Sequence, residues 1–117
     1  MKIEIEKRED IAIINMQGEL DMSTVDNLVA KTKELTYSYR NIIFNFADIE
    51  FVDSTGIGNI IKLFKDNQDA NYLITNLSSD VEEIFYILNL KELLGEKVFT
   101  KTLTEAIDLL KGEKKVN

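Results

Sequence analysis

The chain has 117 residues, of which 44% are hydrophobic, so it is long enough for one domain with its own core. It contains neither cysteine nor histidine, which excludes disulfides, thiolate chemistry and catalysis or metal binding by histidine. The net charge of −7 argues against nucleic acid and anionic membranes as partners, because both attract basic surfaces.

Residues 1–6 alternate polar and apolar side chains, whereas a secretory signal peptide has a continuous apolar stretch. No apolar run approaches the roughly 20 residues of a membrane-spanning helix. We therefore expect a cytoplasmic protein. The chain has no linker or repeat, so we expect residues 1–117 to form one domain, with a frayed charged tail over 111–117.

The first half of the chain predicts a hairpin, a helix and a third strand. Alternation over Lys2–Lys7 and a continuous apolar run over Ile11–Met16 predict two strands joined by a short charged turn. Residues Gly18–Asp21 end the second strand. Ser23–Leu35 has apolar residues at helical spacing, and Asn41–Phe46 is typical of a buried strand.

The second half predicts an alternation of helices and strands. A helix runs from Thr55 to about Asn67, and strands follow over Tyr72–Thr75 and Val98–Lys101. Ser79–Glu82 and Thr102–Glu105 are capping boxes that each begin a further helix. This order predicts an α/β fold with a mixed, mostly parallel sheet of about four or five strands and about four helices.

One predicted helix start differs from the others. Ser23 and Asp26 form a predicted capping pair, and Glu82 and Glu105 place acids in two further first turns, where they offset the helix dipole. The first turn that follows Asp53-Ser54, over 55–58, has no charge and two glycines. Its N–H groups are then expected to lack an internal anion. A phosphate on Ser54 would fit there.

A structural interpretation of the same residues stays open beside this one. Ser54 is also a common N-cap residue, worth ~1 kcal/mol. Gly56 and Gly58 also suit a helix that packs close to a strand. The residues alone do not decide between the two.

Two motifs give the chain a resemblance to a known family. Residues Phe51–Gly58, Phe-Val-Asp-Ser-Thr-Gly-Ile-Gly, resemble the signature of the STAS domain, in particular that of bacterial anti-sigma factor antagonists. Gly18–Asp21, Gly-Glu-Leu-Asp, is similar to a second family motif, and Asn41–Phe46 to the apolar strand before the signature. Order and spacing agree over almost the whole chain, and the resemblance implies the STAS β–α superhelix.

The resemblance also implies a partner-switching role in the regulation of transcription. The unphosphorylated form would bind an anti-sigma factor that is also a serine kinase, and so release the sigma factor. Phosphorylation of Ser54 would end the binding, and a serine phosphatase would reset it. The residues expected to support the phosphorylation site are Asp21, Asp53, Thr55, Gly56 and Gly58. The residues expected to contact the partner are Asp21, Ser54, Thr55, Gly58, Asn59 and Lys62.

Other functions stay possible on the sequence. STAS domains also occur in sulfate transporters, stress-signalling scaffolds and lipid-transport complexes, and a scaffold without a phospho-switch is the alternative. The paired acids in Ser79–Phe85 stand where many relatives have a basic residue, which leaves the partner's identity open. A receiver domain is less favoured, since it needs paired acids after its first strand, which here ends in Lys7-Arg8.

An enzyme is also less favoured. Asp21, Asp53 and Ser54 resemble part of a hydrolase or metal site, but without histidine they give a weak nucleophile and an incomplete ligand set. We therefore expect neither catalysis nor a cofactor or metal.

Overall fold

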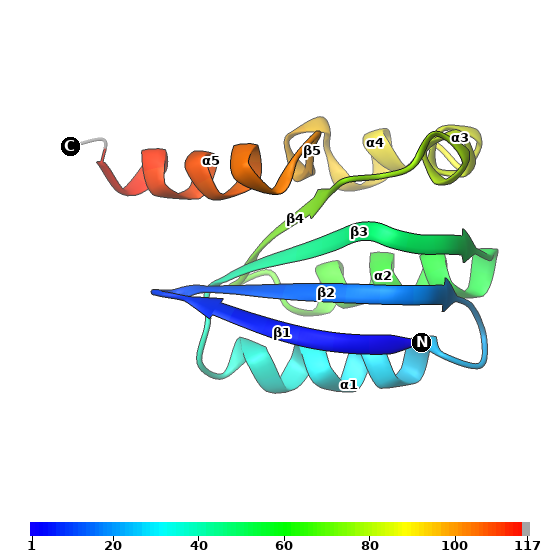
Figure 1. The fold of residues 1–117 in the computed structure, drawn as a ribbon, viewed down its shortest axis with the longest axis horizontal. Coiled ribbons are helices and arrows are strands. Elements are labelled where there is room, and N and C mark those ends of the chain that lie inside the picture. The colour runs from blue at the N-terminus through cyan, green and yellow to red at the C-terminus, as the bar shows by residue number, and fades with distance from the viewer. Residues whose placement is uncertain (116–117) are drawn as a thin grey trace.

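The computed structural model describes the backbone of residues 1–115 and the side chains of residues 1–112. Five strands form one sheet in the order β1-β2-β3-β4-β5 (Figure 1). Their bounds are Lys2–Arg8, Ile11–Leu20, Asn41–Val52, Asn71–Thr75 and Phe99–Thr100. Only the β1–β2 pair is antiparallel within this described part of the chain. The predicted mixed, mostly parallel α/β fold is confirmed.

The helices form two layers, one on each side of the sheet. Their bounds are α1 Val25–Thr36, α2 Ser54–Asp66, α3 Ser79–Ile87, α4 Leu90–Leu94 and α5 Leu103–Lys115, with a 3₁₀ turn η1 over Glu96–Val98. Residues of α1 to α4 share the larger core with one face of the sheet, whereas α5 packs on the other face. In Figure 1, α5 accordingly lies apart from α1 and α2.

The central strands are continuous apolar runs because both of their faces are buried. In β2, Ile13 faces the α5 layer, whereas Ile14 faces the larger core. In β3, Phe46 lies in the larger core, where its ring meets the ring of Phe85 from α3 edge to face, with centroids 5.7 Å apart. This contact fixes α3 against the sheet.

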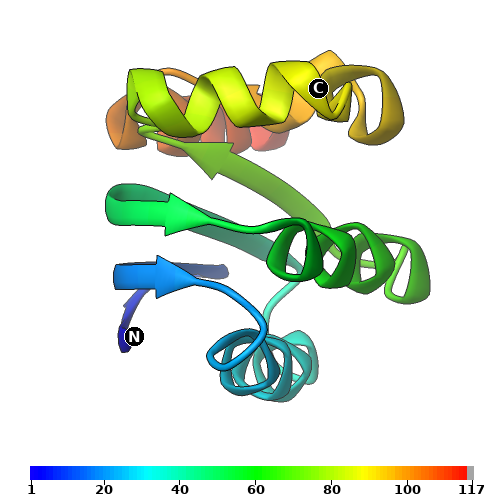
Figure 2. The same ribbon diagram turned by 90° about the vertical axis from the view of Figure 1, so that its right-hand side faces the viewer.

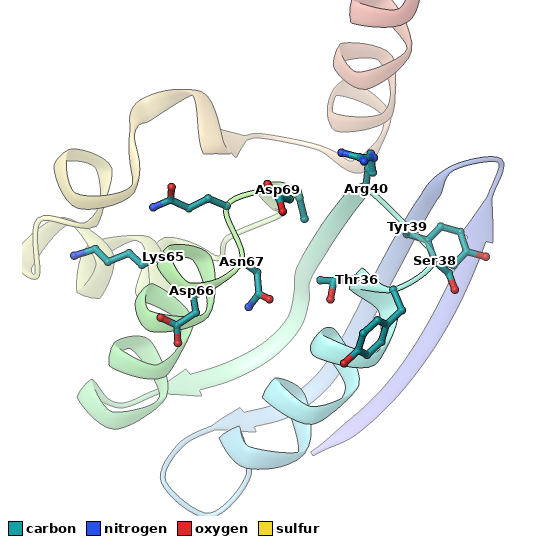
Figure 3. A pocket seen from close by; sticks show the side chains of 11 residues that line it. Thr36, Ser38, Tyr39, Arg40, Lys65, Asp66, Asn67 and Asp69 are labelled. Carbon is teal, nitrogen blue, oxygen red and sulfur yellow. The ribbon is translucent and has the colours of Figure 1, made fainter.

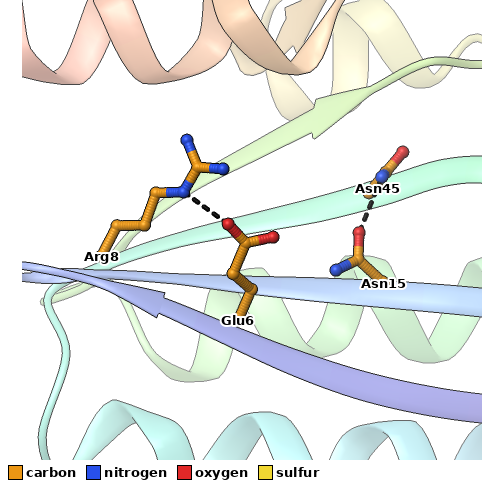
Figure 4. Close-up of polar contacts among 4 residues, drawn as sticks. All are labelled: Glu6, Arg8, Asn15 and Asn45. Atoms are coloured by element: carbon orange, nitrogen blue, oxygen red, sulfur yellow. Dashed lines mark hydrogen bonds and ion pairs between the residues drawn. The ribbon is translucent and has the colours of Figure 1, made fainter.

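Asparagine side chains tie the strands together beyond the backbone ladder. Asn45 donates from Nδ2 to Oδ1 of Asn15 at 2.7 Å (Figure 4). Asn76, which follows β4, donates from Nδ2 to Oδ1 of Asn45 at 3.0 Å. On the edge strand β1, Arg8 forms an ion pair with Glu6 (Figure 4). Charges on an edge strand discourage pairing with other chains.

Two strands are longer than predicted. β2 continues past Met16 to Leu20, and β3 continues past Phe46 to Val52. The strand predicted over Ile11–Met16 is too short, because residues 17–20 pair in parallel with residues 48–52, and β2 ends within Gly18–Asp21, at Leu20. The pairing shifts register between Asn15 and Gln17 and again after Gly18, whose φ of +114° is a conformation that glycine adopts readily at such irregularities.

Two predicted caps are wrong. The helix predicted from Ser23 begins at Val25, and the Ser23 hydroxyl donates to Asp21 instead of capping the helix. In α3 the capping oxygen belongs to Ser78, one residue before the predicted Ser79. The cap of α5 is at Thr102 as predicted, since its Oγ1 accepts from the amide of Glu105 at 3.1 Å.

The C-terminal part holds three further differences. α4 and η1 were not predicted, and Asn89, in the left-handed conformation (φ 60°), breaks the chain between α3 and α4. β5 covers only 99–100 of the predicted 98–101. The frayed tail predicted over 111–117 is wrong for 111–115, which continue α5, while residues 116–117 lie outside the described residues.

Candidate functional site

The two sequence motifs meet at the carboxyl ends of β2 and β3. The strands are parallel neighbours, so their ends lie at the same edge of the sheet, and the amide of Asp53 donates to the carbonyl of Leu20 at 3.1 Å. Figure 2 looks at this end and shows the β2–α1 connection and the start of α2, with α3 crossing above them. The fold therefore brings Asp21 and Asp53 into one site.

Asp53 joins the two loops through its carboxylate. Its Oδ1 accepts from the amide of Gly56 at 2.7 Å, which makes Asp53 the N-cap of α2. Its Oδ2 accepts from the amide of Met22 at 3.2 Å. The prediction of Ser54 as the cap is wrong by one residue. The first turn has no acid, as predicted, but the expectation of no anion at this helix end is wrong, because the Asp53 carboxylate lies there.

Ser54 is the first residue of α2, and its side chain is exposed. Because Asp53 serves as the cap, the Ser54 hydroxyl has no hydrogen-bond partner among the described residues. The hydroxyl is therefore free to meet another molecule. Thr55 beside it is exposed as well.

Asp21 organises the other loop. Its Oδ1 accepts from the hydroxyl of Ser23 at 2.7 Å and from the amide of Ser23 at 2.9 Å. Thr24 donates from its hydroxyl to the carbonyl of Glu19 at 2.7 Å, which closes the same turn. The Ser23 hydroxyl above all, and then its amide, lower the pKa of Asp21 below its ordinary value of 3.8. Asp21 therefore carries a negative charge at neutral pH.

The two glycines of the signature have different surroundings. A Cβ on Gly56 would lie 2.6 Å from the carbonyl oxygen of Leu20, so this glycine lets α2 pack against the end of β2. A Cβ on Gly58 would meet nothing within 4 Å. The close-packing interpretation is thus correct for Gly56 and wrong for Gly58.

The remaining predicted partner residues lie on the outer side of α2. Thr55, Gly58 and Lys62 are exposed and Asn59 is partly exposed, at the spacing of one helix face. Asn59 donates from Nδ2 to the carbonyl of Thr55 at 2.9 Å. The apolar side of the helix, which includes Ile57 and Ile60, is buried in the core.

Comparison with known proteins identifies the family: the model of the STAS domain family matches residues 2–106 of this chain. The chain belongs to the STAS domain family. It is 30% identical over 100 residues to the anti-sigma-B factor antagonist of Staphylococcus epidermidis, a match that covers 80% of this chain and 90% of that relative.

Solved structures with this fold include proteins of different kinds. The anti-sigma factor antagonist SpoIIAA in its unphosphorylated form superposes with a TM-score of 0.78 at 25% identity, over 95% of this chain and 97% of that one. The phosphorylated form of SpoIIAA from Bacillus has a TM-score of 0.69 at 24% identity, over 93% and 99%. A sulfate transporter family protein from Wolinella succinogenes superposes with a TM-score of 0.78 at 15% identity, over 89% of this chain and 87% of that one. At this identity the similarity shows a common fold and nothing more.

Sequence reasoning missed two exposed apolar residues of this STAS domain. Met22 is 73% exposed in the loop after β2, and Phe51 is 47% exposed near the end of β3. The amide of Met22 donates to the Asp53 carboxylate, and Phe51 lies two residues before Asp53 in the chain. A methionine within the polar turn Asp21–Thr24 was the available signal.

A large hollow of the STAS domain lies away from Ser54. It has a volume of about 790 Å³ and lies between the α1–β3 and α2–β4 connections, at the amino ends of the strands (Figure 3). Tyr37, Arg40, Lys65 and Asp66 are among its mostly polar lining residues. Among the described residues, no group of three acidic side chains is placed to hold a metal ion, and no helix is long and apolar enough to cross a membrane.

Proposed function

We propose that this STAS domain is an anti-sigma factor antagonist whose binding is switched off by phosphorylation of Ser54. The observation that carries the proposal is the exposed Ser54 hydroxyl, without a partner in the described part of the chain, beside the Asp53 cap. The relatives named as antagonists support it. In this proposal the protein acts in the cytoplasm by binding and has no catalytic role.

The charges around Ser54 indicate how the switch would work. A phosphoserine carries about −1.5 to −2 charges near neutral pH. The Asp53 carboxylate already accepts the Gly56 amide, so the phosphate would lie beside an existing negative charge rather than in an empty anion site. It would then act mainly on the partner, by repulsion and by its bulk, and leave the fold unchanged.

The size of the effect follows from affinity arithmetic. A loss of about 2–4 kcal/mol in binding weakens the affinity roughly 30- to 1,000-fold. In this proposal the phosphate would add a negative charge beside the exposed side of α2 and disturb partner contacts at Thr55, Gly58 and Lys62. The charge of the phosphate would join that of Asp21, which the neighbouring loop carries in both forms.

The partners follow from the same proposal. The antagonist would bind an anti-sigma factor that has serine-kinase activity, and this kinase would reach the exposed Ser54 in the bound state. A serine phosphatase would restore the unmodified form. Binding would free the sigma factor and so regulate transcription.

Displacement of the sigma factor tests the antagonist role. The unmodified protein is added to a complex of the cognate anti-sigma and sigma factors, and free sigma factor is measured by size-exclusion chromatography. We expect release of the sigma factor. A complex that stays intact in an excess of the protein would contradict the proposal.

Matched variants test the position of the switch. Ser54→Glu is expected to weaken binding to the anti-sigma factor by about tenfold or more, since 1.4 kcal/mol gives a factor of ten. Ser54→Ala is expected to bind and to resist inactivation by the kinase. The control is Ser38→Glu, an equally simple change at an exposed serine in the far hollow, and it is expected to bind normally.

A further inference from the structure

Apolar side chains gather on the surface where α3 ends and α4 begins. Tyr86 is 81% exposed and Ile87 is 70% exposed, and Leu88 and Leu93, within the next six residues of the chain, are exposed as well. These four are half of the large apolar side chains that are exposed among the described residues. We call them the corner surface. Large apolar side chains that are exposed close together often mark a site of interaction.

The packing of α3 keeps this surface outward. Val81 and Phe85 are buried on the inner side of the helix. The Phe85 ring meets Phe46 and Phe99 edge to face, with centroids 5.7 and 6.1 Å apart. The helix therefore cannot turn to bury Tyr86 and Ile87 without loss of these aromatic contacts.

Along the outer side of α3, acidic residues come first in the chain and apolar residues follow. Glu82 and Glu83 are exposed, and each lies four residues before an exposed apolar residue, Tyr86 or Ile87, so all four share one side of the helix. Residues 78–97 contain five acids and two lysines, and so contribute −3 of the net charge of −7. Among the described side chains, the ion pairs lie on β1 and none neutralises these acids.

A hollow of about 410 Å³ borders the corner surface. Its lining residues are Tyr86, Asn89, Lys91, Glu92 and Glu96. Two carboxylates outnumber the one lysine, Lys91, and Glu92 also accepts from Asn89. The net negative charge and the aromatic ring suit the cationic end of a lysine or arginine side chain, which also binds to aromatic faces. The hollow thus adds a cation-accepting feature beside the apolar side chains.

We propose that the corner surface binds a basic amphipathic helix of a partner protein. Apolar residues of that helix would cover Tyr86 and Ile87, and its basic residues would meet the acids of α3 and of the hollow. The surrounding negative charge disfavours a second copy of this acidic chain and an anionic membrane. The surface contains neither Ser54 nor the outer residues of α2, so the proposal goes beyond the phospho-switch.

A synthetic peptide tests the proposal directly. The probe is a 14-residue peptide of Leu and Lys at amphipathic helical spacing, titrated into the full chain by calorimetry near physiological ionic strength. Because truncation of anchor residues in an interface removes much of the binding energy, Tyr86→Ser with Ile87→Ser is expected to weaken binding by about tenfold or more. The matched control is Tyr37→Ser, since Tyr37 is 91% exposed at the far end of the domain. It is expected to bind the peptide as the unchanged chain does.

A second arm tests the charge, and far-UV circular dichroism checks that each variant is folded. Glu82→Lys with Glu83→Lys is expected to weaken binding, and a peptide with Glu in place of Lys is expected not to bind. Equal binding by the Tyr86/Ile87 variant, or by the acidic peptide, would overturn the proposal. So would a dimer in sedimentation that the Tyr86/Ile87 variant abolishes, because the surface would then bind a second copy. Ser54→Glu is expected to bind the peptide normally, which separates this result from the switch.

Discussion

The starts of α2 and α3 lie at the same edge of the sheet but are built differently. α3 is capped by the hydroxyl of Ser78, and Asp80 and Glu82 stand in its first turn. α2 is capped by the carboxylate of Asp53, and its first turn has no acid. Asp53 also accepts from Met22 of the neighbouring loop, whereas the Ser78 hydroxyl accepts within its own helix alone among the described contacts.

The difference shows how one charge can serve two purposes. At α2 the negative charge that offsets the helix dipole also holds the loop of Asp21 in place. The Ser54 side chain is therefore exposed and makes no hydrogen bond with the described residues, while the bonds of Asp53 hold the backbone beside it. At α3 the acids lie along the exposed side of the helix, and none of them bonds to a neighbouring loop among the described contacts.

The largest effect is expected from Gly56→Ala. The added Cβ would lie 2.6 Å from the backbone oxygen of Leu20, which cannot move without disturbing the pairing of β2. Overpacking of this kind destabilises proteins by about 1–3 kcal/mol, and we expect the upper part of this range in the free energy of unfolding in urea. An unchanged stability would mean that α2 does not pack closely on β2.

Removal of the caps compares the two helix starts. Ser78→Ala is expected to lower the free energy of unfolding by about 1 kcal/mol, the usual effect of a lost N-cap. Asp53→Ala is expected to lower it by about 2 kcal/mol, because the bond to Met22 is lost with the cap. Urea unfolding measures both. Equal losses in the two variants would show that the bond between the Met22 amide and Asp53 contributes nothing to stability, and that the two helix starts do not differ in this way.

Gly58→Ala separates the two glycines of the signature. A Cβ at position 58 would meet nothing within 4 Å, and alanine is favoured over glycine in a helix by about 0.5–1 kcal/mol. We therefore expect an increase in stability of that size, opposite in sign to Gly56→Ala. A decrease would indicate a close neighbour at this position.

The smallest effect concerns the pKa of Asp21. The lowered pKa means that the ionised form is favoured in the folded protein, so its contribution is present above the ordinary pKa and is lost as the pH falls through the folded value. Ser23→Ala removes the hydroxyl donor and is expected to raise the pKa of Asp21 toward 3.8 in an NMR titration. An unchanged pKa would exclude that hydroxyl as the cause.

Local patterns predicted the order of the five strands and of α1, α2, α3 and α5, but they missed α4 and η1 and did not predict where the elements end. Alternation and helical spacing indicated the hairpin and the later helices and strands, because those patterns follow from burial on one or both faces. Asp53 and Ser54 are both good N-cap residues, and the choice depended on where β3 ends. β3 ends at Val52 because its pairing with β2 continues to Leu20, which is a tertiary fact.

The site was predictable in its chemistry and less so in its geometry. Asp21, Asp53 and Ser54 were singled out from the motifs, and the fold places both carboxylates in adjoining loops. Gly56 and Gly58 look alike in the sequence, yet only Gly56 meets Leu20, a residue from a distant part of the chain. The exposure of Met22 and Tyr86 likewise depends on packing that no local pattern encodes.

In the proposed switch, phosphorylation of Ser54 controls binding to an anti-sigma factor. The direct measurement is the affinity of the cognate anti-sigma factor for the unmodified protein and for the protein phosphorylated by that kinase, with the modified residue identified by mass spectrometry. We predict one phosphate, on Ser54, and an affinity lower by roughly 30-fold or more. A phosphate on Thr55 instead, or equal affinities of the two forms, would contradict the account.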